Sequence, residues 1–215
     1  MAQIFPKWTL RLPLYAVLGL PLAAAAAVGG VWYWGSPRFT DVGYRPRQPV
    51  EYSHELHVGR LGLDCRYCHA SVERSAVANI PPTQTCMNCH HIIRRDSALV
   101  QPVKESWDLG RPLRWVRVHN LPDYAYFQHA AHVRAGVGCV SCHGRIDQMP
   151  VVTQAEPLSM GWCLDCHRDP ASRLRPADAV TEMEWFTPRD HDEWVAATIQ
   201  EKGIAPPADC SGCHR

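Results

Sequence analysis

Ten cysteines in this 215-residue sequence fall into five Cys-x-x-Cys pairs, and each pair is followed at once by a histidine. Two thiols at this spacing can each add to one of the two vinyl groups of a haem, and the imidazole that follows can ligate the iron. The sequence therefore predicts five covalently bound haems of the c type. The motifs are Cys65/Cys68/His69, Cys86/Cys89/His90, Cys139/Cys142/His143, Cys163/Cys166/His167 and Cys210/Cys213/His214.

Zinc is the main alternative for these motifs. Seventeen residues separate Cys68 from Cys86 and twenty separate Cys142 from Cys163, and a zinc ribbon has about 15 to 20 residues between its two Cys-x-x-Cys pairs. A zinc ribbon does not need a histidine after each second cysteine, however, and it would leave the Cys210 pair without a partner pair. A thioredoxin-like redox pair is disfavoured because no strand-helix-strand pattern surrounds any motif. We therefore favour haem.

Two segments carry a repeated histidine pattern ahead of a haem-binding motif. Both read aromatic-x-His-x-x-His-Val; one starts at Tyr52 and the other at Phe127. A spacing of three residues is close to one helical turn, so the two imidazoles of each segment can lie on one face and ligate two different haems. Surface histidines on an amphipathic helix are the alternative, but the recurrence at the same offset favours ligands.

Seven histidines remain after the five that follow the cysteine pairs, and five irons need five second axial ligands. At least two of the seven must therefore have another role. A methionine can also replace a second histidine, although packing against a haem edge is the favoured explanation for each methionine taken singly. The candidates are His54, His57, His119, His129, His132 and His191, with His91, Met149 and Met160 as weaker ones.

His191 is a candidate for the fifth haem because it lies in a predicted helix with clear boundaries. Thr187 fits the N-cap and Pro188 the first turn, Asp190 completes a Thr-x-x-Asp capping box, and Gly203 ends the helix. An apolar face on this helix can pack against a haem.

An uncharged stretch from Leu12 to Trp34 predicts one transmembrane helix. As a helix it would be about 34 Å long, enough to cross a hydrocarbon core of about 30 Å. Trp32, Tyr33 and Trp34 fit an interfacial anchor at its end. The alternative is a cleaved signal peptide with a cleavage site in the alanine run at 23–27, although the apolar part of a signal peptide is usually about 7 to 15 residues long.

Composition predicts a fold that depends on its cofactors. Aromatic residues make up 9% of the chain and eighteen prolines interrupt it, so we expect mostly short α-helices and loops wrapped around five haems. A net charge of +1 gives no indication of nucleic acid binding. The predicted parts are a cytoplasmic stub (1–11), the membrane span (12–34), a linker (35–50) and a periplasmic pentahaem domain (51–215), with di-haem cassettes at about 51–95 and 119–170 and the fifth motif at 210–214.

The segment 115–168 resembles the pentahaem cytochrome c subunit of bacterial alternative complex III, and the order of one span and five motifs is similar over nearly the whole chain. The aromatic-x-His-x-x-His segments also resemble those of class III multihaem cytochromes. That resemblance implies that the first histidine ligates the haem that follows and the second serves another haem. The similar residues are Trp115, Tyr124, His129, His132, Cys139-Val-Ser-Cys-His, Gly144-Arg-Ile-Asp, Gln154-Ala-Glu-Pro-Leu-Ser-Met160 and Trp162-Cys-Leu-Asp-Cys-His167.

The resemblance implies a non-catalytic electron-transfer subunit of a quinol-oxidising respiratory complex that delivers electrons to a periplasmic acceptor. The implied partners are an iron-sulfur molybdopterin-like subunit, polytopic membrane subunits, a monohaem cytochrome c and membrane lipid. Because c-type cytochromes receive their haems outside the cytoplasmic membrane, we expect a single-pass protein of the bacterial cytoplasmic membrane with Cys65 onward in the periplasm or on the exterior face.

Two other functions remain open from the sequence. One is a membrane-anchored multihaem quinol dehydrogenase that feeds a periplasmic reductase. The other is a nitrite-type multihaem reductase, which in its pentahaem form has a lysine in place of one proximal histidine; all five motifs here have histidine.

Overall fold

The computed structural model describes residues 4–214 and divides into two compact units, 1–41 and 42–215. The first unit contains a 3-10 turn at Lys7–Arg11, helix α1 at Leu12–Trp34 and helix α2 at Pro37–Thr40. Pro13 lies in the first turn of α1, where a missing N–H costs nothing, and the C-cap Gly35 ends the helix.

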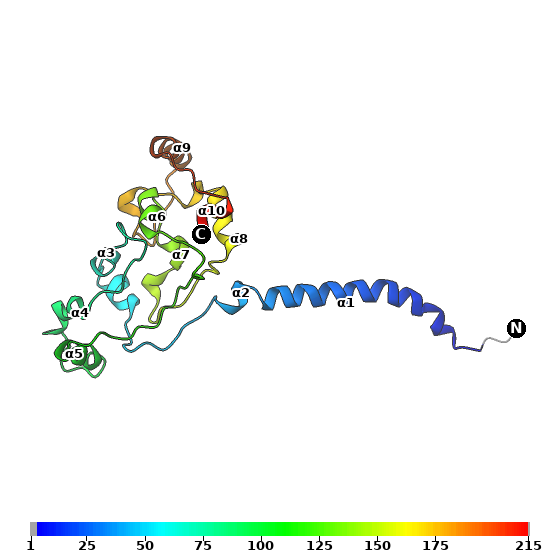
Figure 1. Ribbon diagram of the computed structural model, residues 1–215, viewed down its shortest axis with the longest axis horizontal. Helices are drawn as coiled ribbons and strands as arrows, with labels where there is room; N and C mark the ends of the chain where they lie inside the picture. The colour runs from blue at the N-terminus through cyan, green and yellow to red at the C-terminus, as the bar shows by residue number, and fades with distance from the viewer. Residues whose placement is uncertain (1–3, 215) are drawn as a thin grey trace. The chain divides into compact units, whose positions relative to one another are not determined.

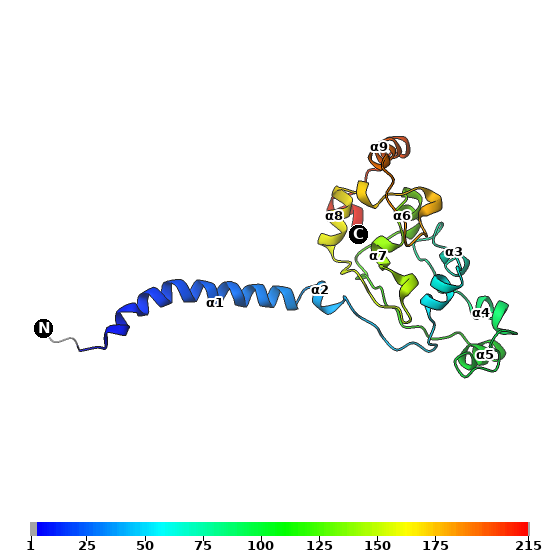
Figure 2. The same ribbon diagram turned by 180° about the vertical axis from the view of Figure 1, so that it is seen from behind.

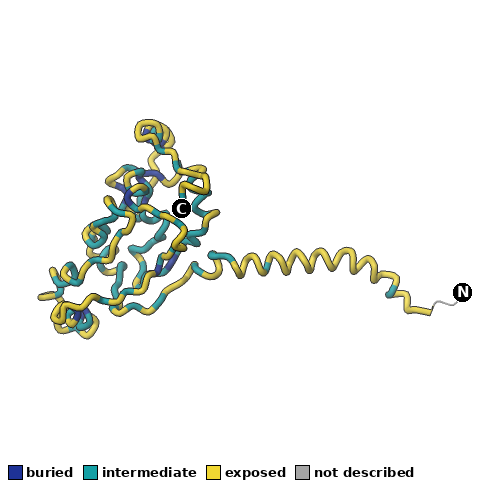
Figure 3. Tube along the Cα trace, viewed as in Figure 1, coloured by how far each residue is buried: buried dark blue, intermediate teal, exposed yellow. Residues whose placement is uncertain are grey.

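Helix α1 exposes its side chains along nearly its whole length, as the colouring of Figure 3 shows. The stretch Lys7–Trp34 has a mean hydropathy of 1.9, and within residues 4–214 it is the one helical segment with the length and composition to cross a membrane. An apolar helix that buries nothing against its own chain has to cover that surface elsewhere.

The second unit is built from short helices joined by loops, and no β-strand occurs within residues 4–214. Two isolated antiparallel bridges, Ala125 with His214 and Val137 with Leu174, tie distant parts of the chain together. Its helices are a π-helical turn at Glu55–Arg60, α3 at Cys65–Cys68, α4 at Thr83–His90, α5 at Gln101–Asp108, α6 at His129–Ala135, α7 at Val140–His143, α8 at Met160–Arg168, α9 at His191–Lys202 and α10 at Cys210–Cys213, with 3-10 turns at Ile146–Gln148, Ala171–Arg173 and Ala177–Ala179.

Helices α4, α3, α7 and α8 follow one another across this unit in that order, and α10 lies beside α8 (Figures 1 and 2). Helix α5 packs against α4, where Thr83 and Ser106 share a hydrogen bond of 2.8 Å between their hydroxyl groups. The order in space therefore differs from the order in sequence, because α3 lies between α4 and α7.

The apolar core of the described residues is small and dispersed. Its members are mostly valines and alanines: Val100, Val103, Val118, Ala130, Leu174, Ala179, Val180 and Val195. Leu174, at 1% exposed, is the largest side chain that the fold buries completely. So little buried apolar area is not enough to stabilise a chain of this length, as the composition predicts.

Leu174→Ala tests how much this core contributes. Removing a completely buried leucine side chain is expected to cost about 2–4 kcal/mol and to lower the thermal unfolding midpoint by roughly 5–10 °C. Leu109→Ala is the matched control, because Leu109 is 62% exposed and its truncation is expected to move the midpoint by less than about 2 °C. Calorimetry of both variants checks this, and equal midpoints would contradict it.

Helix α9 corrects one predicted boundary. It begins at His191 with Asp190 as N-cap, not at Pro188 with Thr187 as N-cap, and no side chain caps its first turn. Gly203 ends it in the left-handed conformation at φ 61°, as predicted. The Thr-x-x-Asp pattern was misleading here because the chain completes a turn at residues 189–190 before the helix starts.

Candidate haem-binding site

Each Cys-x-x-Cys-His motif lies on a short helix, which presents the two thiols one turn apart. Helices α3, α4, α7, α8 and α10 carry the first to fifth motifs, numbered here in sequence order. Side chains cap three of them: Asp64, Ser159 and Asp209 accept hydrogen bonds from backbone N–H groups in the first turns of α3, α8 and α10. All ten cysteines lie in the described region and are free thiols.

Two of these cysteines are less covered by the peptide than the others. Cys89 in α4 and Cys210 in α10 are exposed, whereas the other eight cysteines are partly buried. The reason is position: α4 and α10 carry the motifs at the two ends of the spatial series, so each has a neighbouring motif on one side only (Figures 1 and 2). The polypeptide therefore encloses the inner motifs and leaves Cys89 and Cys210 open to solvent. Thioether attachment of haem at Cys89 stays a prediction from the motif.

Four of the five motif histidines have their rings fixed by a backbone carbonyl. Nδ1 of His69 lies 2.6 Å from the carbonyl oxygen of Asn79, and the corresponding distances are 2.9 Å for His90 to Ile93, 2.6 Å for His167 to Pro207 and 3.0 Å for His214 to Tyr124. A ring that donates from Nδ1 keeps Nε2 unprotonated for a metal ion. This is the arrangement that a proximal iron ligand needs.

Three of the four histidines of the two aromatic-x-His-x-x-His segments are fixed in the same way. Nδ1 lies 2.8 Å from a carbonyl oxygen in His57, His129 and His132. The partners of His57 and His132 are Ser53 and Gln128, each four residues earlier, so the same local geometry recurs in both segments.

The aromatic residue of each segment contacts both of its histidines with matching geometry. The ring of Tyr52 meets the edge of His54 at 4.8 Å and stacks on His57 at 4.5 Å. The ring of Phe127 does the same with His129 at 4.7 Å and with His132 at 4.5 Å. These contacts explain why the aromatic residue has the same position in both segments. Its ring packs against both imidazoles and fixes their orientations.

Three of these histidines face motif histidines at the separation of an axial pair. Two imidazoles bonded at about 2 Å to opposite sides of one metal ion place their ring centroids about 6 Å apart. The observed centroid distances are 6.2 Å for His57 with His90, 6.4 Å for His129 with His143 and 6.0 Å for His132 with His167. The polypeptide thus leaves room for one metal ion between the rings of each pair.

A buried cluster of histidines surrounds the third motif. Burial, together with smaller effects of the nearby His119, His129, His69 and His54, lowers the pKa of His143 to about 3. Burial likewise lowers the pKa of His54 to about 4. These imidazoles are neutral at pH 7, which is the form that ligates metals.

The same cluster contains buried nitrogen atoms without hydrogen-bond partners: Nδ1 of His54, Nε2 of His119 and Nδ1 of His143. Buried polar atoms are almost always paired in native proteins. The site is therefore incomplete as polypeptide alone, and the donor set fits iron porphyrin.

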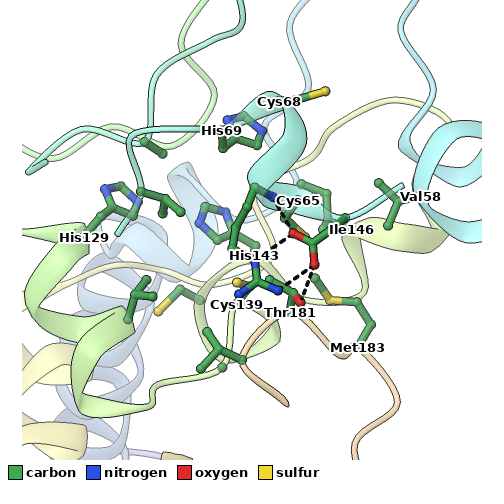
Figure 4. Close-up of a pocket in the computed structure, with 18 of the residues that line it drawn as sticks. Val58, Cys65, Cys68, His69, His129, Cys139, His143, Ile146, Thr181 and Met183 are labelled. Atoms are coloured by element: carbon green, nitrogen blue, oxygen red, sulfur yellow. Dashed lines mark hydrogen bonds and ion pairs between the residues drawn. The ribbon is translucent and has the colours of Figure 1, made fainter. Parts of the chain in front are cut away.

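A cavity joins the first and third motifs. It encloses about 1160 Å³ of empty space, including its opening to solvent, and both cysteines and the histidine of each motif line it. Figure 4 shows His69, His129 and His143 around this cavity, with Cys65 and Cys139 close to one another. Val58, Val72 and Ile146 are among the apolar side chains in its wall. An apolar cavity with thiols at its edge and imidazoles in its wall suits the attachment of haem.

Neighbouring motifs are close in the order second, first, third, fourth, fifth. The side chain of Asn88 donates to the Tyr67 hydroxyl at 3.2 Å between α4 and α3. A thiol-thiol hydrogen bond between the first and third motifs raises the pKa of Cys65 and lowers that of Cys139.

The remaining steps of this order run through the thiols of the last three motifs. Burial, together with smaller effects of the nearby Cys166 and Cys163 thiols of the fourth motif, raises the pKa of Cys142 to about 12. Burial also raises the pKa of Cys163, and Cys213 of the fifth motif adds to that effect. Each motif is thus within electrostatic range of the next.

The other candidate ligands lie differently. Nδ1 of His91 contacts the Met87 carbonyl at 2.8 Å and its ring is exposed. Met160 is 67% exposed at the start of α8, and Met149 is half-buried. His119 is close to His143, with ring centroids 4.5 Å apart at 77°, which is shorter than an axial pair requires.

His191 has an environment unlike that of the other ligand candidates. It is 6% exposed between Trp185 and Trp194, and its Nε2, the usual ligating atom, is 2.9 Å from the Leu174 carbonyl oxygen. This arrangement joins α9 to the buried Leu174 segment.

Comparison with known proteins relates part of the chain to a known family. Residues 125–215, which contain the third, fourth and fifth motifs, match the family described as cytochrome c7 and related cytochrome c. This part of the chain therefore resembles multihaem cytochromes c, and the helices and loops without a β-strand within residues 4–214 agree with that likeness.

The chain is also similar to the multihaem cytochrome c subunit of menaquinone reductase from Nitratidesulfovibrio vulgaris. The two are 31% identical over 125 residues, which is 57% of this chain. The similar region spans 58% of the length of that relative. The chain is thus similar, over part of its length, to a multihaem subunit of menaquinone reductase.

Sequence reasoning missed two features of the site. It recorded the aromatic residues of the repeat but gave them no role, although their recurrence at one offset was a usable signal. It also missed Arg175, a buried arginine beside Cys139. No signal in the sequence connects Arg175 with Cys139, because the two residues are 36 positions apart along the chain.

Proposed function

We propose that this chain is a membrane-anchored pentahaem cytochrome that relays electrons from quinol oxidation to a periplasmic acceptor. The three histidine pairs with centroids 6.0 to 6.4 Å apart carry the proposal, because they join distant segments into two-sided ligand sets. When bound, haem c takes up and releases single electrons at its iron. Two imidazoles per iron suit this role, since they leave no position for a substrate.

The proposed ligand sets follow from these pairs. His57 and His90 ligate at the second motif, His129 and His143 at the third, and His132 and His167 at the fourth. For the first motif, His69 has two candidate partners in the buried cluster, His54 and His119. In the second segment the first histidine serves the motif that follows it, as in the class III cytochromes that the repeat resembles.

His191 is not among the proposed ligands. Its Nε2 is engaged with the Leu174 carbonyl oxygen and its ring lies between two tryptophans. We infer that it stabilises the packing of α9 and that the sequence prediction of an axial role does not apply to it.

The proposed path follows the order of the motifs in space: second, first, third, fourth, fifth. The Cys65–Cys139 contact supports the central step, and the shared cavity supports it independently. The third motif then lies in the middle of the relay, with two motifs on one side and two motifs on the other. The exposed thiols Cys89 and Cys210 belong to its two ends, where electrons would enter and leave.

The proposed setting is the bacterial cytoplasmic membrane, with α1 as a single span and the haem domain in the periplasm. The length and apolar composition of Lys7–Trp34 support an anchor. Similarity to a subunit of menaquinone reductase supports partners within a quinone-linked complex. We propose assembly with the iron-sulfur, polytopic and monohaem subunits of an alternative complex III, and no catalysis by the chain itself.

Purification of the full chain from native membranes tests this proposal. We expect it to co-purify with polytopic subunits, and a menaquinol analogue added to that complex should reduce its haems within one turnover. If the chain is purified without polytopic partners and the quinol analogue still reduces it, the relay proposal is wrong and the second candidate, a quinol dehydrogenase that feeds a periplasmic reductase, replaces it. That candidate is favoured by the quinone-linked relative alone.

A further inference from the structure

Arg175 is a buried arginine that has no carboxylate partner. The residue is 8% exposed, and its Nε is buried without a hydrogen-bond partner. Nη1 donates to the carbonyl oxygen of Glu182 at 2.7 Å and, at 3.4 Å, to that of Ala179. The guanidinium carbon lies 5.0 Å from the centroid of the Trp185 ring. Within residues 4–214 no carboxylate oxygen comes within ion-pair distance of it.

Such a charge is costly to bury. An arginine does not lose its proton in a protein, so burial without a counter-ion costs several kcal/mol. Burial lowers the pKa of Arg175, which reports the same penalty. A leucine would fill the same space with a smaller desolvation penalty. We therefore expect the positive charge of Arg175 to have a role of its own.

Two glycines allow the guanidinium to reach its position. Gly136 adopts φ +100°, and a Cβ built on it would lie 2.4 Å from the carbonyl oxygen of Arg175. A Cβ on Gly138 would lie 2.4 Å from the guanidinium carbon. The Arg175 N–H donates to the Gly136 carbonyl at 2.9 Å next to the Val137–Leu174 bridge. The backbone therefore packs the guanidinium directly against Gly138.

Gly138 precedes Cys139, so the charge lies beside the first cysteine of the third motif. Cys139 raises the pKa of Arg175 and Arg175 lowers that of Cys139, which places the two groups within electrostatic range of each other. Cys139 also forms the thiol-thiol contact with Cys65. The positive charge is thus fixed where the first and third motifs meet.

We propose that Arg175 raises the reduction potential of the haem held by Cys139, Cys142 and His143. The inference rests on the proposed function, since it requires a haem at the third motif. A fixed positive charge stabilises the reduced iron, which carries one positive charge fewer than the oxidised iron, and burial protects this effect from screening. Arg175 acts through this field and through no bond to the iron, so it is a positioning residue.

Optical redox titration of the fully haem-loaded chain tests this role. In Arg175→Met we expect one of the titrating components to become about tenfold harder to reduce, a shift of about 59 mV for a one-electron couple. Arg175→Lys keeps the charge and is expected to stay close to the wild-type potentials. Arg189→Met is the matched control, because Arg189 is an exposed arginine whose charge is screened by solvent. If the methionine variant does not load haem, Arg175→Gln, which can still donate to the Glu182 carbonyl, takes its place.

Three results would overturn the inference: unchanged potentials in Arg175→Met and Arg175→Gln, an equal shift in Arg175→Lys, or an equal shift in Arg189→Met. An equal shift in the lysine variant would mean that shape matters and charge does not. Covalent haems are counted by mass spectrometry before the titration, because this count tests the proposed function separately from the role of Arg175. A wild-type chain without haem at Cys139 and Cys142 would refute the proposed function, whereas a loaded chain with unmoved potentials would refute the role of Arg175 alone.

Discussion

Replacing His129 by alanine is expected to add one carbon monoxide-binding haem to those of the unaltered chain. His129 lies opposite His143 at a centroid distance of 6.4 Å with the two ring planes 10° apart. Its removal leaves one iron position without a protein ligand, and carbon monoxide occupies such a position in the reduced state. Difference spectra of the reduced chain with and without carbon monoxide measure the effect, and we expect one more carbon monoxide per chain than in the unaltered protein.

His191→Ala is the matched control for this prediction. His191 is also buried and also packs beside aromatic rings, but its Nε2 contacts a backbone carbonyl. We expect this variant to be less stable and to bind no more carbon monoxide than the unaltered chain. Additional carbon monoxide binding in His191→Ala would return His191 to the ligand set, and its absence in His129→Ala would remove His129 from it.

Removal of the third cysteine pair is expected to have the largest effect on stability. In the double variant Cys139→Ala and Cys142→Ala, the chain should lose the mass of one haem and its thermal midpoint should fall by roughly 10 °C or more. The reason is that the third motif shares its cavity with the first, so loss of one cofactor also leaves the neighbouring site unfilled.

The fifth motif provides the comparison. Cys210 is exposed, and α10 has no buried residue. Cys210→Ala with Cys213→Ala should therefore lose the same mass but lower the midpoint by only a few °C, about 2–4 °C. Intact-mass measurement and calorimetry on both double variants check this. Equal midpoints for the two double variants would show that the third motif contributes no more to stability than the fifth.

The sequence predicted the attachment chemistry because that chemistry is local. Two thiols and an imidazole within five residues need no tertiary structure to be identified, and α1 is an apolar run that a local pattern also reveals. The aromatic-x-His-x-x-His repeat was predictable for the same reason. Both segments fix their second histidine through a carbonyl four residues earlier, which is a local contact as well.

The remaining features depend on contacts between distant residues. His57 faces His90 across 33 positions and Arg175 reaches Cys139 across 36, and no spacing rule connects such residues. The exposure of Cys89 is of this kind too, because the motif alone does not say which of the five pairs lies at an end of the series. His191 illustrates the limit most clearly: its helix was predictable, but the partner of its Nε2 is the carbonyl of Leu174, which only the folded chain brings near.

The number of haems bound covalently to one chain tests the central claim most directly. Intact-mass spectrometry of the denatured chain, combined with iron analysis, counts thioether-linked haem separately from any metal held only by the fold. The account predicts five haems and five iron atoms per chain, with one haem on each peptide that contains a Cys-x-x-Cys-His motif. Zinc in place of iron, or fewer than five covalent haems per chain, would contradict it.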